Sequence, residues 1–346
     1  MSPREADASV DEIVRRGDID ELLRLVDAQC THRDWDGLST LRERCARAHE
    51  TGHQLWPAAA HAAYRLALEA PGPFAAAVLV EDAARFALGP LPEVAAQHHA
   101  WGELSPHLER GAPAVLAAHE RVMRGEDLSD IDLPGPPVLE VPLRLASWEP
   151  RYALAEYRAH DADFPMPALP ALAPVELPTR HAATGPDETT TALRDLVQAW
   201  ASRSEGRVEV VAVEGSALDA IAAISALRGG AGAGSARVAR LEPAEAQALM
   251  AWAGASGGAH GRRPGAAPGR FGAWWAAATL TGLADDWPPE PDRLGAELPS
   301  LAWFTWDLAE PASGWRFHLA VEHPDRGRAW AIAATDAHET TPSEGS

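Results

Sequence analysis

The residues best suited to chemistry lie in a glycine- and arginine-rich stretch, SGGAHGRRPGAAPGR, at residues 256–270. It contains five glycines, three arginines and one histidine, and it lies between two apolar runs that carry tryptophan. An apolar helix is predicted to begin at Phe271, and the free N–H groups at the start of a helix attract anions. Guanidinium groups beside them would add charged hydrogen bonds to a phosphate or carboxylate. The alternative is an arginine-rich surface loop.

The candidate anion-binding residues are His260, Arg262, Arg263, Arg270 and His318. We expect the three guanidinium groups to converge on one small pocket, near the exposed edge of the strand that carries His318. Exposed arginines contribute little to stability. Removing these three charges is therefore expected to abolish anion binding and to leave folding unchanged.

His318 belongs to an alternating segment, GWRFHLAVE, at residues 314–322, which is typical of a β-strand. One face of this strand is expected to be core and carries Trp315, Phe317, Leu319 and Val321. The other face either meets solvent or forms the floor of a pocket, and it carries Arg316, His318, Ala320 and Glu322.

Other catalytic motifs are not supported. The sequence GGAGAG at residues 229–234 follows a predicted helix and precedes a strand, the reverse of the order in a dinucleotide-binding loop. The sequence GASGG at residues 254–258 places Ser256 after a helix, whereas a nucleophile elbow follows a strand. The chain has no lysine, which excludes a Schiff-base lysine and a P-loop lysine. No catalytic residue and no cofactor are predicted.

One group of residues has the spacing of metal ligands. Cys45, His49 and His53 lie on one face of a predicted helix, and Cys30 and His32 lie upstream. Thiolates and imidazoles of this kind bind zinc. However, Cys45 also falls in an apolar stripe, and free cysteine is commonly buried. We therefore predict buried core thiols and no metal site.

Hydrophobic periodicity divides the chain into three parts. Residues 1–126 are predicted to form a helical array with about six helices over residues 12–125, including one at residues 74–88. Residues 188–338 show the order α-β-α-β-α-α-β-β-β. The predicted fold class is α+β, with an N-terminal antiparallel helical array (α-solenoid-like or a bundle) followed by an α/β domain with a mixed sheet. That sheet is expected to have a parallel start and an antiparallel meander. Residues 339–346 are expected to form a disordered tail.

Residues 127–187 are rich in proline and form either a linker or an extended arm. Proline disfavours long helices and holds the preceding residue extended. Leucine, valine and aromatic residues are interleaved with the prolines, so we favour an ordered arm packed on a domain. The segment VLEVPLRL, at residues 138–145, is predicted to add an edge strand.

The net charge of −20 opposes binding to nucleic acid, which depends on neutralised phosphates. No uninterrupted apolar run is long enough to span a membrane. The N-terminal residues are charged and lack an apolar signal core, so we expect a cytoplasmic protein.

Two runs resemble those of an uncharacterised family from high-GC Gram-positive bacteria. They are QLWPAAAHAAYRLALEAPGPFAAAVLVEDAARFALGPLPEV and GGAHGRRPGAAPGRFGAWWAAA. The resemblance spans most of the chain and implies no activity or catalytic residue.

We therefore expect a non-catalytic binding or scaffold protein. Its helical region would bind a protein partner, and its α/β region would bind a small anionic ligand. The alternative is an enzyme acting on a phosphorylated or carboxylated small molecule at residues 257–270.

Limited proteolysis tests the arm. We expect a protease at low concentration to spare residues 127–187, because packed backbone is a poor protease substrate. Mass spectrometry of the fragments locates the first cuts. Rapid cutting between Pro165 and Pro174 would show that the arm is free.

Overall fold

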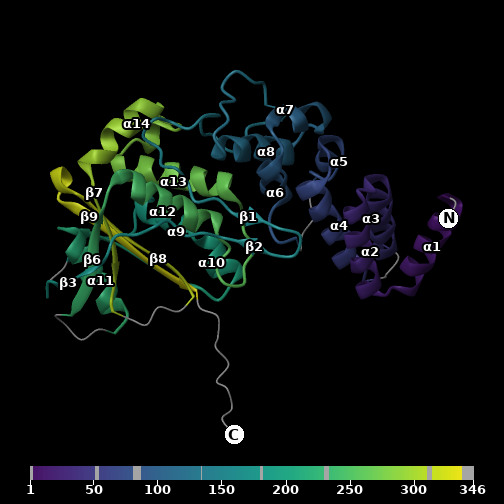
Figure 1. Ribbon diagram of the computed structural model, residues 1–346. Coiled ribbons are helices and arrows are strands. Elements are labelled where there is room, and N and C mark those ends of the chain that lie inside the picture. Colours follow the sequence, from purple (N-terminus) through teal and green to yellow (C-terminus); the bar gives the residue numbers. More distant parts are fainter. Residues whose placement is uncertain are drawn as a thin grey trace, which may run out of the picture. The chain divides into compact units, whose positions relative to one another are not determined.

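The computed structural model describes residues 3–50, 54–80, 87–133, 135–179, 182–229, 234–309 and 314–336. The chain divides into two compact units. Residues 1–139 and 155–164 form the helical unit, and residues 140–154 and 165–346 form the sheet unit. Helices make up most of the first and an extended sheet dominates the second, so the predicted α+β class with an N-terminal helical array is confirmed (Figure 1). The predicted tail at residues 339–346 lies outside the described residues.

The helical unit consists of short helices joined by tight breaks. Leu22, Val26 and Cys30 have helical spacing and form the buried face of one of them. That helix begins after Asp18, whose side chain accepts a hydrogen bond from a backbone N–H, and it ends at Arg33 in the left-handed conformation. The helices are α1 (Pro3–Arg16), α2 (Ile19–His32), α3 (Trp35–Glu50), α4 (Trp56–Glu69), α5 (Gly72–Ala77), α6 (Leu91–His98), α7 (Trp101–Leu104) and α8 (Ala112–Met123).

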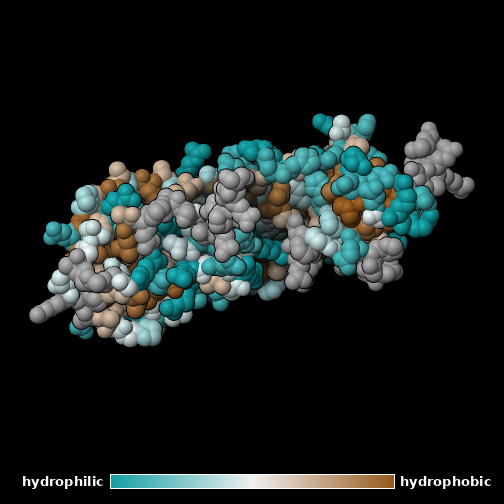
Figure 2. All heavy atoms as spheres, turned by 90° about the horizontal axis from the view of Figure 1, so that it is seen from below, coloured by the Kyte–Doolittle hydropathy of each residue, from teal (hydrophilic) through white to brown (hydrophobic). Residues whose placement is uncertain are grey.

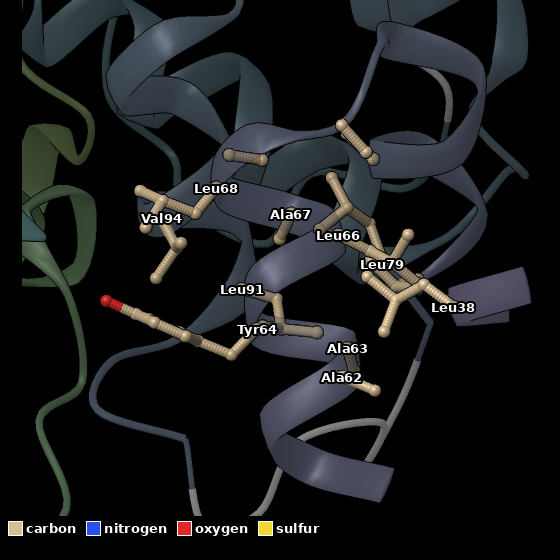
Figure 3. Packing of buried hydrophobic residues seen from close by; sticks show 14 of the residues in the cluster. Leu38, Ala62, Ala63, Tyr64, Leu66, Ala67, Leu68, Leu79, Leu91 and Val94 are labelled. Carbon is tan, nitrogen blue, oxygen red and sulfur yellow. The ribbon is translucent and has the colours of Figure 1, made fainter. Parts of the chain in front are cut away.

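Helix α4 contributes many residues to the core of this unit. Figure 3 shows Leu66 of this helix close to Leu38 and Leu79. Cys30 and Cys45 are free and buried, as expected for core thiols. The helix predicted at residues 74–88 is wrong in extent: α5 ends at Ala77, before two valines that disfavour helix, and residues 81–86 lie outside the described residues.

Within its described residues, the sheet unit forms a seven-stranded sheet in the order β3-β6-β7-β8-β9-β5-β4. Every neighbouring pair is antiparallel, so the predicted parallel start is wrong. Strands β5 and β6 run in the same direction, but three strands lie between them. Strands β8 and β9 are buried on both faces and therefore take the centre. The strands are β3 (Ala173–Glu176), β4 (Ala182–Ala183), β5 (Arg207–Glu214), β6 (Ser235–Leu241), β7 (Ala302–Asp307), β8 (Trp315–His323) and β9 (Arg328–Asp336).

The proline-rich segment supplies both edge strands of this sheet, β3 and β4. Proline has no N–H to donate. An edge strand tolerates Pro174, because it has a neighbour on one side only and needs fewer donors. The strand predicted at residues 138–145 is wrong, since this stretch is irregular and Pro142 interrupts it. The segment also adds a small hairpin to the helical unit, β1 (Glu156–Tyr157) and β2 (Ala162–Asp163). Its buried hydrophobic residues are Leu128, Leu139, Val141, Tyr152, Ala155, Tyr157 and Leu177.

Helices cover both faces of the large sheet (Figure 1). Helix α11 (Ala217–Leu227) packs on Ala320, Ala331 and Ala333. Helices α9 (Glu188–Leu196) and α12 (Pro243–Ala255) cover the opposite face, and α13 (Ala266–Thr281) packs on both of them. Helices α10 (Gln198–Arg203) and α14 (Pro291–Glu297) complete the unit. The second face of β8 is therefore not a solvated surface. Among the described residues, no helix is long and apolar enough to cross a membrane.

The contact between α11 and the sheet can be tested with Ala331, which is fully buried. Ala331→Asp would bury a charge without a partner, and an uncompensated buried charge costs about 3–5 kcal/mol. We expect the free energy of unfolding in urea to fall by that amount. Ala226→Asp, at an exposed position of α11, is the control and should lower the free energy of unfolding by less than about 1 kcal/mol. Similar small effects of both changes would show that α11 does not cover this face.

Candidate functional site

The helix that follows the glycine- and arginine-rich stretch begins earlier than the sequence predicted. Helix α13 begins at Ala266, not at Phe271. Gly265 adopts a positive φ of 117° immediately before it, and Pro268 lies in the first turn, where a missing N–H costs nothing. Arg270 therefore lies within the helix and not beside its free N–H groups.

Arg270 is buried and paired. Its guanidinium group donates two hydrogen bonds of 2.7 Å to the Glu149 carboxylate. It donates two more, each of 2.8 Å, to the carbonyl oxygens of Pro142 and Arg144. It also lies over the Trp274 ring, 5.5 Å from the centroid. The side chains of Arg270 and Glu149 are 1% and 0% exposed, so this pair is a structural clamp and not an open anion site.

The charge on Glu149 depends on the same contacts. Burial alone would raise the pKa of Glu149, but the hydrogen bonds and charge of Arg270 outweigh burial. Hydrogen bonds from the Tyr152 hydroxyl (2.6 Å) and the Ala146 N–H (2.8 Å) contribute to the lowered pKa. The carboxylate is therefore ionised at neutral pH, opposite a guanidinium that is always charged.

The structure does not bring the predicted anion-binding residues into one site. His260 is exposed, and its backbone N–H donates to the Ser204 hydroxyl over 3.1 Å. Arg262 is exposed, Arg263 is half-buried, and Arg270 is held by its clamp. His318 lines a pocket to which none of the other four contributes. The expected convergence of the guanidinium groups near His318 is wrong, because Arg270 has nearer acceptors in the proline-rich segment.

The glycines of the stretch serve close packing. Gly258 has a φ of +78°, and a Cβ atom there would meet the Asp336 carboxylate. The same carboxylate accepts a 2.5 Å hydrogen bond from the Ala259 N–H. Gly269 lies against the backbone of α12, where a Cβ atom would meet the Ala251 carbonyl. The stretch is thus fixed against β9 and α12.

A pocket of about 610 Å³ lies beside this stretch, with Pro264 and Pro268 in its wall. Its charged residues, Asp195 and Arg203, are both exposed. The pocket therefore offers an apolar groove with solvated charges at its margin, which gives little discrimination between ligands.

A second pocket, of about 410 Å³, lies where the sheet opens. Strands β7 and β8 pair only as far as Thr305 and Leu319. Beyond that point β7 continues along β6, and β8 continues along β9. Side chains replace the missing ladder: the Thr305 hydroxyl donates to the His318 carbonyl (3.2 Å), and His318 Nδ1 lies 3.1 Å from the Trp306 carbonyl. We name this cavity the sheet pocket.

Aromatic rings form much of the sheet pocket. Trp252 and Trp315 are stacked, with centroids 5.4 Å apart and an interplanar angle of 22°. Trp306 and His318 are stacked at 4.7 Å and 23°. The arm contributes a further wall with Met166, Leu169, Pro170 and Leu172.

Several buried nitrogen atoms of this lining have no hydrogen-bond partner among the described residues. They are Nε1 of Trp252, Nε1 of Trp306, Nη1 of Arg316 and Nε2 of His318. Because His318 Nδ1 faces a carbonyl oxygen, it carries the ring proton, and Nε2 is left as an acceptor. Buried polar atoms without partners are uncommon and mark a site where a water or a ligand completes the bonding.

The charged residues of the sheet pocket are Asp307 and Arg316, and Arg237 binds Asp307 from outside the lining. Asp307 accepts two hydrogen bonds from Arg237, at 2.8 and 2.7 Å, and lies 3.8 Å from Arg316. Two guanidinium groups thus share one carboxylate. Burial would raise the pKa of Asp307, but Arg237 outweighs burial and lowers it. Burial, assisted by the charge of Arg228, lowers the pKa of His318 to about 3, so this imidazole is neutral at pH 7.

The sequence identified His318 but not the residues around it. The alternation of β8 placed Arg316 and His318 on one face, and a pocket floor was one of the two alternatives for that face. Trp252 could not be assigned, because it comes from α12 and its position depends on helix packing.

A family model described as a family of unknown function (DUF6183) matches residues 20–338. The chain belongs to this family, so the expected resemblance to an uncharacterised family is confirmed. No curated protein and no solved structure matches the chain. Its function is therefore inferred from the geometry of its sites.

The structural role of Arg270 can be tested directly. Arg270→Met removes the guanidinium that pairs with the buried Glu149 carboxylate and donates to two carbonyl groups, and breaking a buried pair costs about 3–5 kcal/mol. We expect the free energy of unfolding in urea to fall by that amount. Arg262→Met, at an exposed position, should change it by less than about 0.5 kcal/mol. A small effect of both substitutions would restore the prediction that these arginines are exposed.

Proposed function

We propose that the protein is a non-catalytic binding protein whose sheet unit holds a small, planar, anionic molecule in the sheet pocket. The observation that carries the proposal is the combination of stacked aromatic rings, buried unpaired nitrogen atoms and the Arg316 guanidinium in one cavity. A volume of about 410 Å³ lies within the usual range of ligand pockets, roughly 300–1,000 Å³.

The lining defines the class of ligand. The indole faces of Trp252 and Trp315 favour a planar ring, because aromatic pairs gain energy beyond burial of area. His318 Nε2 accepts a hydrogen bond, so the ring should carry an N–H or O–H donor. Arg316 favours a carboxylate or phosphate. A heteroaromatic acid or a nucleoside monophosphate meets all three requirements.

The same groups argue against a reaction in this pocket. Its titratable residues are Asp307, Arg316 and His318. Arg237 occupies the Asp307 carboxylate, and the pKa of His318, at about 3, makes it a weak base at neutral pH. Among the described lining residues, neither group is suited to proton transfer at pH 7.

The alternative of an enzyme at residues 257–270 receives no support from the geometry, since Arg270 is committed to Glu149. In the helical unit, the described large hydrophobic residues that are exposed are Val80, Leu88 and Val138. The hydrophobic atoms visible on the face shown in Figure 2 occur in separate groups among hydrophilic ones. A protein partner for the helical unit remains an expectation from the sequence.

The ligand class can be tested by thermal shift and calorimetry. We expect nucleoside monophosphates or heteroaromatic carboxylates to raise the melting temperature, because a ligand at about 100 times its Kd adds about 2.7 kcal/mol. The uncharged parent rings and free phosphate, each lacking one feature, should bind more weakly.

Arg316→Gln should weaken binding of the ligand found by about 10- to 150-fold, since a charged hydrogen bond contributes about 1.5–3 kcal/mol. Arg262→Gln is the matched control and should bind as the wild type does. The proposal fails if no compound of these classes binds, or if Arg316→Gln retains full affinity.

A further inference from the structure

Three side chains with metal-binding atoms meet in the helical unit. They are Asp27 from α2, His61 from α4 and His160 from the turn between β1 and β2. Asp27 Oδ1 lies 3.7 Å from His61 Nε2 and 3.5 Å from His160 Nε2. One ligand atom from each residue lies within 4.8 Å of the other two. The two imidazole rings are stacked, with centroids 5.6 Å apart.

These separations suit a single bound ion. Zinc lies about 2.0–2.2 Å from imidazole nitrogen and carboxylate oxygen, so two ligands of a tetrahedral site are about 3.3 Å apart. The two distances to Asp27 exceed this value by a few tenths of an ångström. Small rotations of His61 and His160 would bring all three atoms within reach of one ion, and the His160 side chain is 65% exposed.

The hairpin that carries His160 is held in place by the helices. The Tyr64 hydroxyl donates to the Arg158 carbonyl, and Figure 3 shows this hydroxyl pointing away from α4. The Gln97 side chain makes two hydrogen bonds to the backbone of Tyr157, of 2.6 and 2.9 Å. The Tyr157 hydroxyl donates to Glu93 over 2.7 Å. His160 is thereby positioned opposite His61 before any ligand binds.

The Asp27 carboxylate is also oriented. Arg65 donates a hydrogen bond to Asp27 Oδ1, and it binds Glu69 through Nε (2.7 Å) and Nη2 (3.1 Å). Outer partners of this kind fix the direction of a ligating carboxylate. Asp27 and Glu69 carry two negative charges against one positive charge on Arg65, so the cluster retains a net charge of about −1 that favours a cation.

We propose that Asp27, His61 and His160 form a binding site for one divalent transition-metal ion, zinc by the type of its ligands. Two imidazoles and one carboxylate form a ligand set of catalytic zinc sites, which leave a coordination position open. The open position would face a cavity of about 450 Å³, whose wall includes Leu23, Trp56 and Leu88. This site is separate from the sheet pocket, and neither proposal depends on the other.

Isothermal titration of tag-free, chelator-treated protein with Zn²⁺ tests the site. We expect one equivalent to bind to the wild type. His160→Ala should weaken that binding by at least about 100-fold. It removes a ligand, and loss of a residue that only orients a ligand already costs about 10- to 100-fold. His160 is exposed, so this variant should keep the melting temperature of the wild type. His107→Ala removes another exposed histidine of the same unit and should bind Zn²⁺ as the wild type does.

Asp27→Asn gives a second test, because it keeps the size of the side chain and removes its charge. We expect weaker Zn²⁺ binding here also, and if this variant does not fold, His160→Ala decides alone. The proposal is overturned if the wild type binds less than one equivalent, if His160→Ala binds as the wild type does, or if His107→Ala loses as much affinity as His160→Ala.

Discussion

The sheet unit depends on the buried ion pair between Arg270 and Glu149. The segment from Glu140 to Leu154 is irregular and rich in proline, so no strand ladder satisfies its carbonyl groups. Buried carbonyl groups need donors, and the Arg270 guanidinium supplies two of them besides binding the carboxylate. An apolar pair of the same size could fill the space, but it could not bind those carbonyl oxygens. The clamp therefore gives the segment one conformation.

The sheet pocket follows from the topology of the same unit. A continuous antiparallel ladder leaves no cavity, but the pairing of β7 with β8 stops at Thr305 and Leu319, and beyond this point each strand is paired only with its other neighbour. The separation leaves backbone and side-chain polar groups that the ladder would have satisfied. His318 occupies part of the opening and satisfies one carbonyl. The rest of the opening holds unpaired nitrogen atoms beside aromatic rings, and it is here that we propose a ligand binds.

The elements that sequence predicted correctly are those determined by local periodicity. The buried stripe of α2 and the inward face of β8 follow from spacing alone, and Phe317 and Leu319 are buried as expected. Strand order is not local: the order of the strands depends on which are apolar on both faces. The clamp was also beyond local reasoning, because Arg270 and Glu149 are 121 residues apart. Asp27, His61 and His160 come from three separate elements and show no spacing pattern.

The absence of lysine explains why the arginines at residues 256–270 led to the wrong prediction of an anion site. Where every basic residue is arginine, the same residue type must serve as surface charge, as buried clamp and as ligand contact. A glycine-rich stretch with three arginines suggests an anion site, yet Arg270 in that stretch binds both oxygens of Glu149. Arg237, in β6, binds both oxygens of Asp307 in the same way. Charge alone does not identify a site; the geometry of the partner does. Arg316 is the informative residue: its Nη1 lies 3.8 Å from Asp307, both of whose oxygens already accept hydrogen bonds from Arg237, and this nitrogen makes no hydrogen bond among the described residues.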